Sequence, residues 1–270
     1  MSSAWQGKTV WLTGASSGIG RILALKLAKL GATVLISARR QQALEELAQQ
    51  EPQLLLPLPV DVSDAEAIAE TQRRIGERVE AIDVAIFSAG VVEYEDNLDF
   101  DLGRYQRVFA ANFFGLVNSV TIAFPWLKKS KNKPHIVGLT SLAMKVGFPR
   151  AEAYGSSKAA ADYFLKSLRM DLSPEAFDIS IVRPGFVKTP MTSVNDFSMP
   201  FLMDANEAAE RIVQGMETKK LFINFPKRFS LLLSVLSWMP WLWYRCLGPK
   251  LNRHENQPSN NNSISSKEVL

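Results

Sequence analysis

A glycine-rich segment, residues 13–20, constrains the fold of this 270-residue chain more than any other feature. It follows a short apolar run at 9–12 and opens a helical pattern of apolar residues at 19, 22, 23, 27 and 30. Glycines between a strand and a helix permit a tight turn and let the backbone approach a pyrophosphate, which the unpaired N–H groups of the helix N-terminus attract. We therefore predict a dinucleotide-binding turn formed by Gly14, Ser16, Ser17, Gly18, Ile19 and Gly20; the alternative is a glycine turn without a ligand.

The pattern up to residue 226 alternates short β-branched or apolar runs with longer helical segments. This alternation is typical of a parallel sheet covered by helices on both faces. We predict an α/β fold, a Rossmann-type doubly wound parallel sheet of about seven strands, with strands at 9–12, 33–37, 54–58, 84–87, 136–139, 179–182 and 221–225. Helices are expected at 206–216 and at 65–79, where Ser63 and Glu66 have the form of a capping box.

Three segments of the chain differ in composition. Residues 1–226 form the predicted dinucleotide-binding and catalytic domain, 227–254 an apolar and basic extension, and 255–270 a polar tail too poor in apolar residues to order itself. The one cysteine, Cys246, excludes an internal disulfide and favours a reducing compartment. Because the N-terminus lacks the pattern of a secretory signal, we expect a cytoplasmic protein. We predict neither a metal site nor a nucleic-acid partner.

The end of the second predicted strand bears on the choice between NAD and NADP. Its sequence is Ile36-Ser37-Ala38-Arg39-Arg40, without a carboxylate. An acidic residue there would bind the adenosine ribose hydroxyls and repel a phosphate, whereas Arg39, helped by Ser37 or Arg40, suits a 2′-phosphate. We predict NADP as the cofactor in preference to NAD. The alternative is a pair of solvated arginines before a helix.

Tyr154 and Lys158 carry the sharpest chemical signal. The i, i+4 spacing of the two places the phenol and the ammonium on one helix face. A phenol, with a pKa of about 10, is a poor base at neutral pH, but a nearby lysine cation and an oxidised nicotinamide favour its ionised form. In the reducing direction Tyr154 would donate a proton to a carbonyl oxygen. The alternative is a core tyrosine beside an exposed lysine.

Over about residues 7–225, the Thr-Gly-x-x-x-Gly-x-Gly turn and the Tyr-x-x-x-Lys pair resemble the classical short-chain dehydrogenase/reductase family. The resemblance implies that Ser141, thirteen residues before Tyr154, orients the substrate oxygen. It also implies that the backbone of Asn112 holds a water molecule in a proton relay through Lys158. Thr140 is the neighbouring alternative to Ser141, but strand alternation turns it to the opposite face.

The same resemblance implies further contacts to the cofactor. Asp61 and Val62 match the adenine-contacting pair of the family. Ser88, Ala89 and Gly90 match its Asn-Ala-Gly element, although Ser88 departs from the usual asparagine. The segment that covers the nicotinamide is matched by Pro184, Gly185, Val187 and Thr189.

One apolar region indicates the substrate side of the protein. Met191, Phe197, Met199, Phe201, Leu202 and Met203 fall where the family has its substrate lid, and they favour a hydrophobic substrate. Core packing or a dimer surface would explain them equally well.

Within the extension at 227–254, the apolar stretch at 229–242 is too short, and too interrupted by Pro240, to span a bilayer. From residue 218 to residue 254, Lys or Arg occurs at 219, 220, 227, 228, 245, 250 and 253, and Asp and Glu are absent. Together with Trp238, Trp241, Trp243 and Tyr244, these cations favour peripheral contact with the inner face of a membrane. The alternative is docking on the domain or on a second subunit.

These features predict an NADP-dependent oxidoreductase that interconverts a carbonyl and a secondary alcohol, as a reductase of a hydrophobic substrate. Its catalytic residues would be Asn112, Ser141, Tyr154 and Lys158. A non-catalytic dinucleotide sensor or scaffold on the same fold is the alternative. A lyase or an epimerase is disfavoured by the glycine spacing. The family resemblance implies a homodimer or a homotetramer.

Overall fold

The computed structural model describes residues 3–95, 100–173, 175–193 and 195–251. The predicted tail at 255–270 and residues 252–254 of the extension lie outside the described residues.

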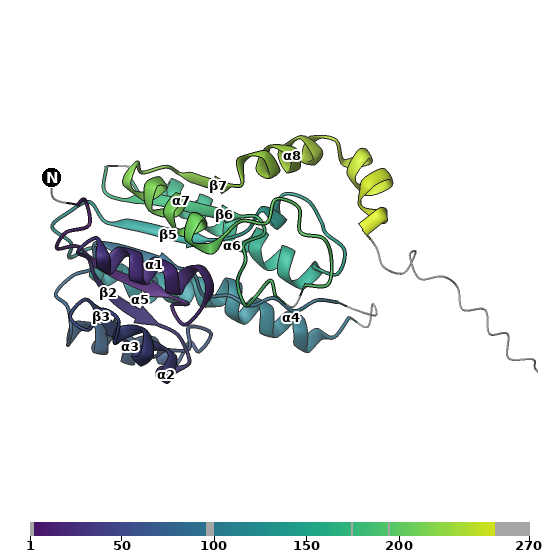
Figure 1. The fold of residues 1–270 in the computed structure, drawn as a ribbon. Helices are drawn as coiled ribbons and strands as arrows, with labels where there is room; N and C mark the ends of the chain where they lie inside the picture. The colour runs from purple at the N-terminus through teal and green to yellow at the C-terminus, as the bar shows by residue number, and fades with distance from the viewer. Residues whose placement is uncertain (1–2, 96–99, 174, 194, 252–270) are drawn as a thin grey trace, which may run out of the picture.

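One parallel sheet of seven strands lies at the centre of the fold (Figure 1). The strand order is β3-β2-β1-β4-β5-β6-β7, and every neighbouring pair is parallel. The order reverses between β1 and β4, so the two halves wind outward from there. The predicted doubly wound sheet is confirmed, with strands β1 (Thr9–Thr13), β2 (Thr33–Ser37), β3 (Leu55–Pro57), β4 (Val84–Phe87), β5 (His135–Leu139), β6 (Asp178–Pro184) and β7 (Phe222–Phe225).

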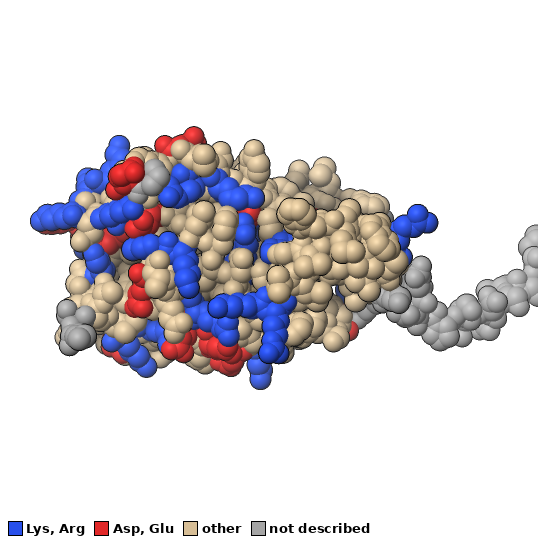
Figure 2. All heavy atoms as spheres, turned by 90° about the horizontal axis from the view of Figure 1, so that it is seen from above, with Lys and Arg blue, Asp and Glu red and all other residues tan. Residues whose placement is uncertain are grey.

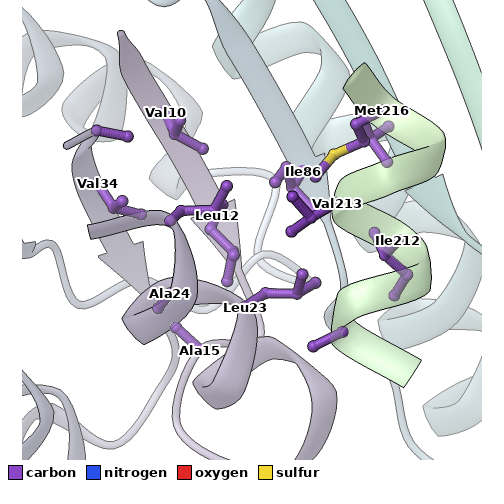
Figure 3. Packing of buried hydrophobic residues seen from close by; sticks show 14 of the residues in the cluster. Val10, Leu12, Ala15, Leu23, Ala24, Val34, Ile86, Ile212, Val213 and Met216 are labelled. Atoms are coloured by element: carbon purple, nitrogen blue, oxygen red, sulfur yellow. The ribbon is translucent and has the colours of Figure 1, made fainter. Parts of the chain in front are cut away.

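Helices cover both faces of the sheet. One face packs against α1 (Gly18–Lys29), α2 (Gln41–Ala48) and α7 (Ala205–Glu217). The other packs against α3 (Ala67–Gly76), α5 (Gly115–Leu127) and α6 (Glu152–Asp171). Alternation along β1 divides the core, because Val10 and Leu12 face the first group (Figure 3) and Trp11 faces the second.

The helix predicted at 65–79 begins later than expected, and its proposed capping box does not form. α3 starts at Ala67, and the hydroxyl and the amide of Ser63 both donate to Asp61 Oδ1, at 2.6 and 2.9 Å. The carboxylate of Asp61 thus holds Ser63 in a turn after β3. Asp64 accepts instead from the amide of Glu66, at 2.9 Å.

A continuous helix from Leu102 to Leu127 combines α4 (Leu102–Phe109), a π-helical turn η1 (Ala110–Phe114) and α5. Among the described residues, it alone is long and apolar enough to cross a membrane by length and composition. Its α5 part lies on the sheet in the second core cluster, where Leu116, Ile122 and Leu127 are buried. Packing against the sheet therefore explains its apolar character.

The C-terminal extension consists of α8 (Lys227–Trp238), a π-helical turn η3 (Leu242–Leu247) and a short 3-10 turn η4 (Pro249–Leu251). It continues from β7 and projects past the end of the sheet (Figure 1). Phe229, Leu233, Leu236 and Trp243 form its buried face. The division of the chain at residue 226 stays a prediction.

Candidate active site

A cleft of about 360 Å³ opens at the carboxyl ends of the strands, where the strand order reverses. This is the place where open α/β sheets bind ligands. Every residue predicted above to contact the cofactor lines it, from Gly14 in the first turn to Thr189 after β6, and so do Ser141, Tyr154 and Lys158. Asn112 lies behind the cleft.

The turn after β1 is shaped to accept a dinucleotide phosphate. Gly14 has φ +74°, and a Cβ there would lie 2.6 Å from the amide nitrogen of Ala89. A Cβ on Gly20 would lie 2.2 Å from the carbonyl oxygen of Gly14. Within the described chain, Ser17 at the N-cap of α1 makes no side-chain capping bond, which leaves first-turn N–H groups to a ligand. These features fit a bound pyrophosphate.

The end of β2 presents two arginines at the rim of the cleft. Arg39 and Arg40 are exposed, and Arg40 Nη2 lies 3.4 Å from Ser16 Oγ in the glycine turn. Ser37 differs from them, because it is fully buried and its hydroxyl accepts a bond of 2.9 Å from Trp11 Nε1. Arg39 and Arg40 are thus cations that could reach a 2′-phosphate at this rim of the cleft.

Tyr154 projects from the first turn of α6 beside Ser141, which follows β5. Burial raises the pKa of the Tyr154 phenol, and a hydrogen bond with Ser141 lowers it in part. The hydroxyl of Thr140 donates elsewhere, to the carbonyl oxygen of Val182 at 3.1 Å. Ser141, not Thr140, is thus the hydroxyl that meets the phenol.

Lys158 lies one helical turn beyond Tyr154 and is only 5% exposed. Its Nζ is 6.0 Å from the centre of the Tyr154 ring and donates to the carbonyl oxygen of Leu139 at 3.2 Å. Burial lowers the pKa of Lys158 to about 8. The pKa of Tyr154 is raised, although the sequence suggested that a nearby lysine would lower it. Burial outweighs the attraction of a lysine whose own charge is disfavoured.

Asn112 has a position that its sequence context did not reveal. It sits in η1 and is 2% exposed. Its Oδ1 accepts from the amide of Val91 at 2.8 Å, and its Nδ2 donates to the carbonyl of Val91 and to Ser157 Oγ, both at 2.9 Å. Gly90 provides the space for the side chains of Asn112 and Lys158, because a Cβ on Gly90 would lie 2.8 Å from Asn112 Oδ1 and 3.1 Å from Lys158 Nζ.

The segment after β6 closes the cleft opposite the glycine turn. Val187 pairs with Met203 in an isolated bridge, and Thr189 Cγ2 would meet a Cβ on Gly18 at 3.3 Å. Thr192 was not predicted, yet it holds this segment together: its Oγ1 donates to the carbonyl oxygen of Val187 at 2.6 Å and accepts from the amide of Thr189 at 3.0 Å. The sequence signal that could have identified Thr192 is its hydroxyl, three residues after Thr189. The other lining residues that were missed are Ala38, Val60, Ser63, Val91, Ala111, Leu139 and Pro190.

Aromatic residues border the substrate side. Tyr94 donates its hydroxyl to Asn195 Oδ1 at 2.8 Å, and its ring meets Phe197 edge-on at 5.8 Å. Phe197 in turn meets Phe186 at 5.9 Å. Burial, followed by repulsion from Tyr154, raises the pKa of Tyr94 to about 12. No sequence pattern pointed to Tyr94, which stands in an irregular segment after β4.

The family model of the short chain dehydrogenases matches residues 8–197. The chain belongs to the short chain dehydrogenase family. It is accordingly an NAD(P)-dependent oxidoreductase that acts on CH–OH groups, as the resemblance implied. The matched region holds the glycine turn, Ser141, Tyr154 and Lys158, and it ends before α7.

Curated relatives of this dehydrogenase agree with the family. It is 34% identical over 222 residues to an uncharacterized oxidoreductase of Myxococcus xanthus, covering 81% of this chain and 87% of the relative. It is 35% identical over 250 residues to the 11-beta-hydroxysteroid dehydrogenase-like 3 of Arabidopsis thaliana, covering 87% and 75%.

Solved structures share the fold of this dehydrogenase. A short chain dehydrogenase/reductase of Burkholderia phymatum in complex with NAD has a TM-score of 0.78 at 20% identity, covering 85% of this chain and 92% of that one. A short chain dehydrogenase of Burkholderia cenocepacia in complex with NADP has a TM-score of 0.76 at 23% identity, covering 90% and 98%.

Proposed function

We propose that this dehydrogenase uses NADPH to reduce the carbonyl group of a hydrophobic substrate to a secondary alcohol, with Tyr154 as the proton donor. The observation that carries the proposal is that Tyr154, Ser141 and Lys158 line the same cleft as the glycine turn. The bound dinucleotide supplies the hydride. Tyr154 supplies the proton, so that C=O becomes CH–OH.

The surroundings of each proposed catalytic residue indicate its role in the reaction. Burial keeps the phenol of Tyr154 protonated at neutral pH, which is the state a proton donor needs. Ser141 donates to the same substrate oxygen as negative charge develops there. Lys158, with a pKa of about 8, exchanges its proton close to neutral pH and so serves to restore the proton of Tyr154. Asn112 positions the helix that carries both.

Arg39 and Arg40 support NADP rather than NAD. The similar solved structures include one complex with each cofactor, so the fold alone does not select. Two exposed arginines beside the glycine turn offer charge-assisted hydrogen bonds to a 2′-phosphate, which NAD lacks.

The substrate class follows from the aromatic border of the site. The rings of Tyr94, Phe197 and Phe186 contact one another in series, and the exposed Met191 lines the same cleft as Tyr154. Such a border suits a large apolar body with one polar group at Tyr154. A relative named as a hydroxysteroid dehydrogenase supports the same class of substrate.

The outward side chains of the extension support peripheral membrane contact at the inner, cytoplasmic face of a membrane. Figure 2 shows this end of the molecule as a largely uncharged surface. Its exposed apolar side chains include Leu231, Leu232, Val235, Trp238 and Trp241. Lys227 and Arg228 are exposed at the start of α8. Aromatic and apolar groups edged by cations suit a bilayer with anionic lipid.

Binding to vesicles tests the membrane contact. The wild type should sediment with vesicles of phosphatidylcholine and phosphatidylserine, and Trp238→Ser with Trp241→Ser should reduce the bound fraction. A protein that stays in the supernatant with these vesicles contradicts it.

Self-association is the remaining part of the proposal. Phe114, Tyr163 and Met170 are exposed on the helices at one side of the sheet. Apolar groups on neighbouring helices suit a homodimer or a homotetramer, which light scattering on the purified protein measures.

A substrate screen tests the catalytic proposal. The purified protein is mixed with NADPH and a panel of ketones and aldehydes that includes steroids and long-chain ketones, and nicotinamide absorbance is followed. The proposal is supported if the wild type turns over a carbonyl compound and if Ser141→Ala and Tyr154→Phe each abolish this turnover. Tight NADPH binding without turnover across the panel would instead support the non-catalytic sensor.

A further inference from the structure

Residues 142–148 form most of the connection from Ser141 to α6, which begins at Glu152 and carries Tyr154. They begin with a 3-10 turn, η2 (Leu142–Met144), and have no regular structure from Val146 to Phe148. A segment with so few internal hydrogen bonds depends on its neighbours for a fixed position. Its neighbours here belong to the C-terminal extension, which lies outside the region matched by the family model.

Two consecutive side chains of η3 hold the backbone of Gly147. Trp243 Nε1 donates to the carbonyl oxygen of Gly147 at 2.8 Å, and the amide of Gly147 donates to the hydroxyl of Tyr244 at 3.1 Å. Both polar groups of one peptide residue are therefore satisfied by the extension. Loss of either partner would leave a backbone group to find water or another partner.

Apolar packing and a lysine reinforce this attachment. Leu142 and Val146 share one buried cluster with Trp243 and with Phe229 and Leu233 of α8. The ring of Phe148 meets Trp243 edge-on at 5.3 Å.

Lys145 Nζ donates to the carbonyl oxygen of Ser230 at 3.2 Å, and it also bonds the hydroxyl of Ser234. The segment at 142–148 is thus attached to both α8 and η3.

The extension also contacts the segment on the opposite border of the site. Phe229 stacks on Phe186 with ring centres 5.7 Å apart. A Cβ on Gly185 would lie 2.9 Å from Phe229 Cδ1. One element outside the family region therefore touches both segments that flank the substrate.

We propose that the C-terminal extension completes the substrate half of the site, with Trp243 and Tyr244 as positioning residues that hold the segment between Ser141 and Tyr154. The proposal rests on the reductase function proposed above. Cofactor binding should not depend on the two bonds to Gly147, because the glycine turn and Arg39 line the cleft and Gly147 does not.

Matched variants separate positioning from stability. Trp243→Phe removes one indole N–H bond from a buried ring. Trp5→Phe does the same at a remote place, because Trp5 is 4% exposed and donates to Glu217 Oε1 at 2.9 Å. Tyr244→Phe removes one hydroxyl, and Tyr163→Phe, on the exposed face of α6, is its control.

Hydrogen exchange in the full-length protein is the first measurement. Tyr244→Phe and Trp243→Phe should speed amide exchange in the 142–148 peptide by about 10-fold, as expected for one lost hydrogen bond. The control variants should leave that peptide unchanged, and all four variants should bind NADPH as the wild type does. Equal exchange in Trp243→Phe and Trp5→Phe would overturn the proposal. If Trp243→Phe does not fold, Tyr244→Phe decides alone.

Kinetics with 2-decanone form the second measurement. Trp243→Phe should raise KM for the ketone by about 5- to 10-fold, while KM for NADPH and the pH profile of kcat stay unchanged. A merely structural role would lower the amount of active enzyme and leave KM unaltered. If the wild type reduces no carbonyl compound, the proposed function fails, and the exchange measurement still decides whether the extension holds the segment.

Discussion

Asn112 Nδ2 donates to Ser157 Oγ at 2.9 Å and thereby joins the π-helical turn η1 to α6, one residue before Lys158. The same side chain satisfies both backbone groups of Val91. A single buried amide therefore connects the segment after β4 with the helix that carries the acid–base pair. The family resemblance gave a role to the backbone of Asn112, and the structure adds a role for its side chain.

Asn112→Ala should lower the free energy of unfolding by about 2–4 kcal/mol, because it leaves two partly buried backbone groups of Val91 and the buried hydroxyl of Ser157 without this partner. It should also lower kcat, because Lys158 loses its support. Asn132→Ala, which removes one exposed bond to Asp83, is the control and should cost less than about 1 kcal/mol. Urea denaturation measures both. Equal losses in the two variants would contradict this role of the buried amide.

Lys158→Met should inactivate the enzyme and yet stabilise the fold at pH 7. Burial holds the pKa of Lys158 in the folded state at about 8, below its ordinary value. Below pH 8 the buried ammonium is charged, and it lowers the free energy of unfolding by its full amount. That cost falls as pH rises from about 8 toward about 10.5. The variant should therefore gain about 1–3 kcal/mol at pH 7, and the gain should vanish near pH 10.5. A variant that is less stable than the wild type at pH 7 would be evidence against this environment for the ammonium.

Arg39→Asp should reverse the cofactor preference. It removes a cation from the rim of the cleft and places a carboxylate where a 2′-phosphate would lie. We expect kcat/KM with NADPH to fall by about 30- to 100-fold, equivalent to about 2–3 kcal/mol, with no loss for NADH. Comparable values of kcat/KM for the two cofactors in the wild type would rule out recognition of the phosphate.

His135 should make the fold sensitive to acid. Its ring is buried beside Ser180, with the two side chains 2.8 Å apart, and burial lowers its pKa to about 3. Because the folded-state pKa is depressed, stability is present above about pH 6.5 and is lost as pH falls toward 3. Between pH 7 and pH 4.5 the wild type should lose about 2–3 kcal/mol more than His135→Gln. Parallel losses in the two proteins would show that His135 is not the source.

The sheet could be predicted because its strands are short β-branched runs with both faces buried. The expected ranges at 33–37 and 84–87 match β2 and β4. The glycine turn could be predicted for a similar reason, since close backbone approach at Gly14 and Gly20 excludes any side chain. The spacing of Tyr154 and Lys158 was readable because a helix converts sequence distance directly into one face.

The spacing of residues in the sequence could not predict which of several possible hydrogen-bond or packing partners a side chain takes. Ser63 was expected to cap a helix, but Asp61 offered its hydroxyl and amide a nearer acceptor. Ser37 accepts a hydrogen bond from Trp11 on the neighbouring strand, which spacing did not reveal, and its help to Arg39 stays a prediction. Trp243 was read with its neighbours as a lipid contact, whereas it is 5% exposed and bonded to Gly147. Each outcome depends on a residue far away in the sequence or on a neighbouring turn.

The rate of carbonyl reduction by Tyr154→Phe, measured with saturating NADPH beside the wild type, tests the central claim most directly. The substitution keeps the ring and removes the hydroxyl group whose proton the mechanism uses. The account predicts a fall in kcat of about 1,000-fold or more, with the Kd for NADPH within about twofold of the wild-type value. A variant that retains wild-type kcat would contradict the assignment of Tyr154 as the proton donor.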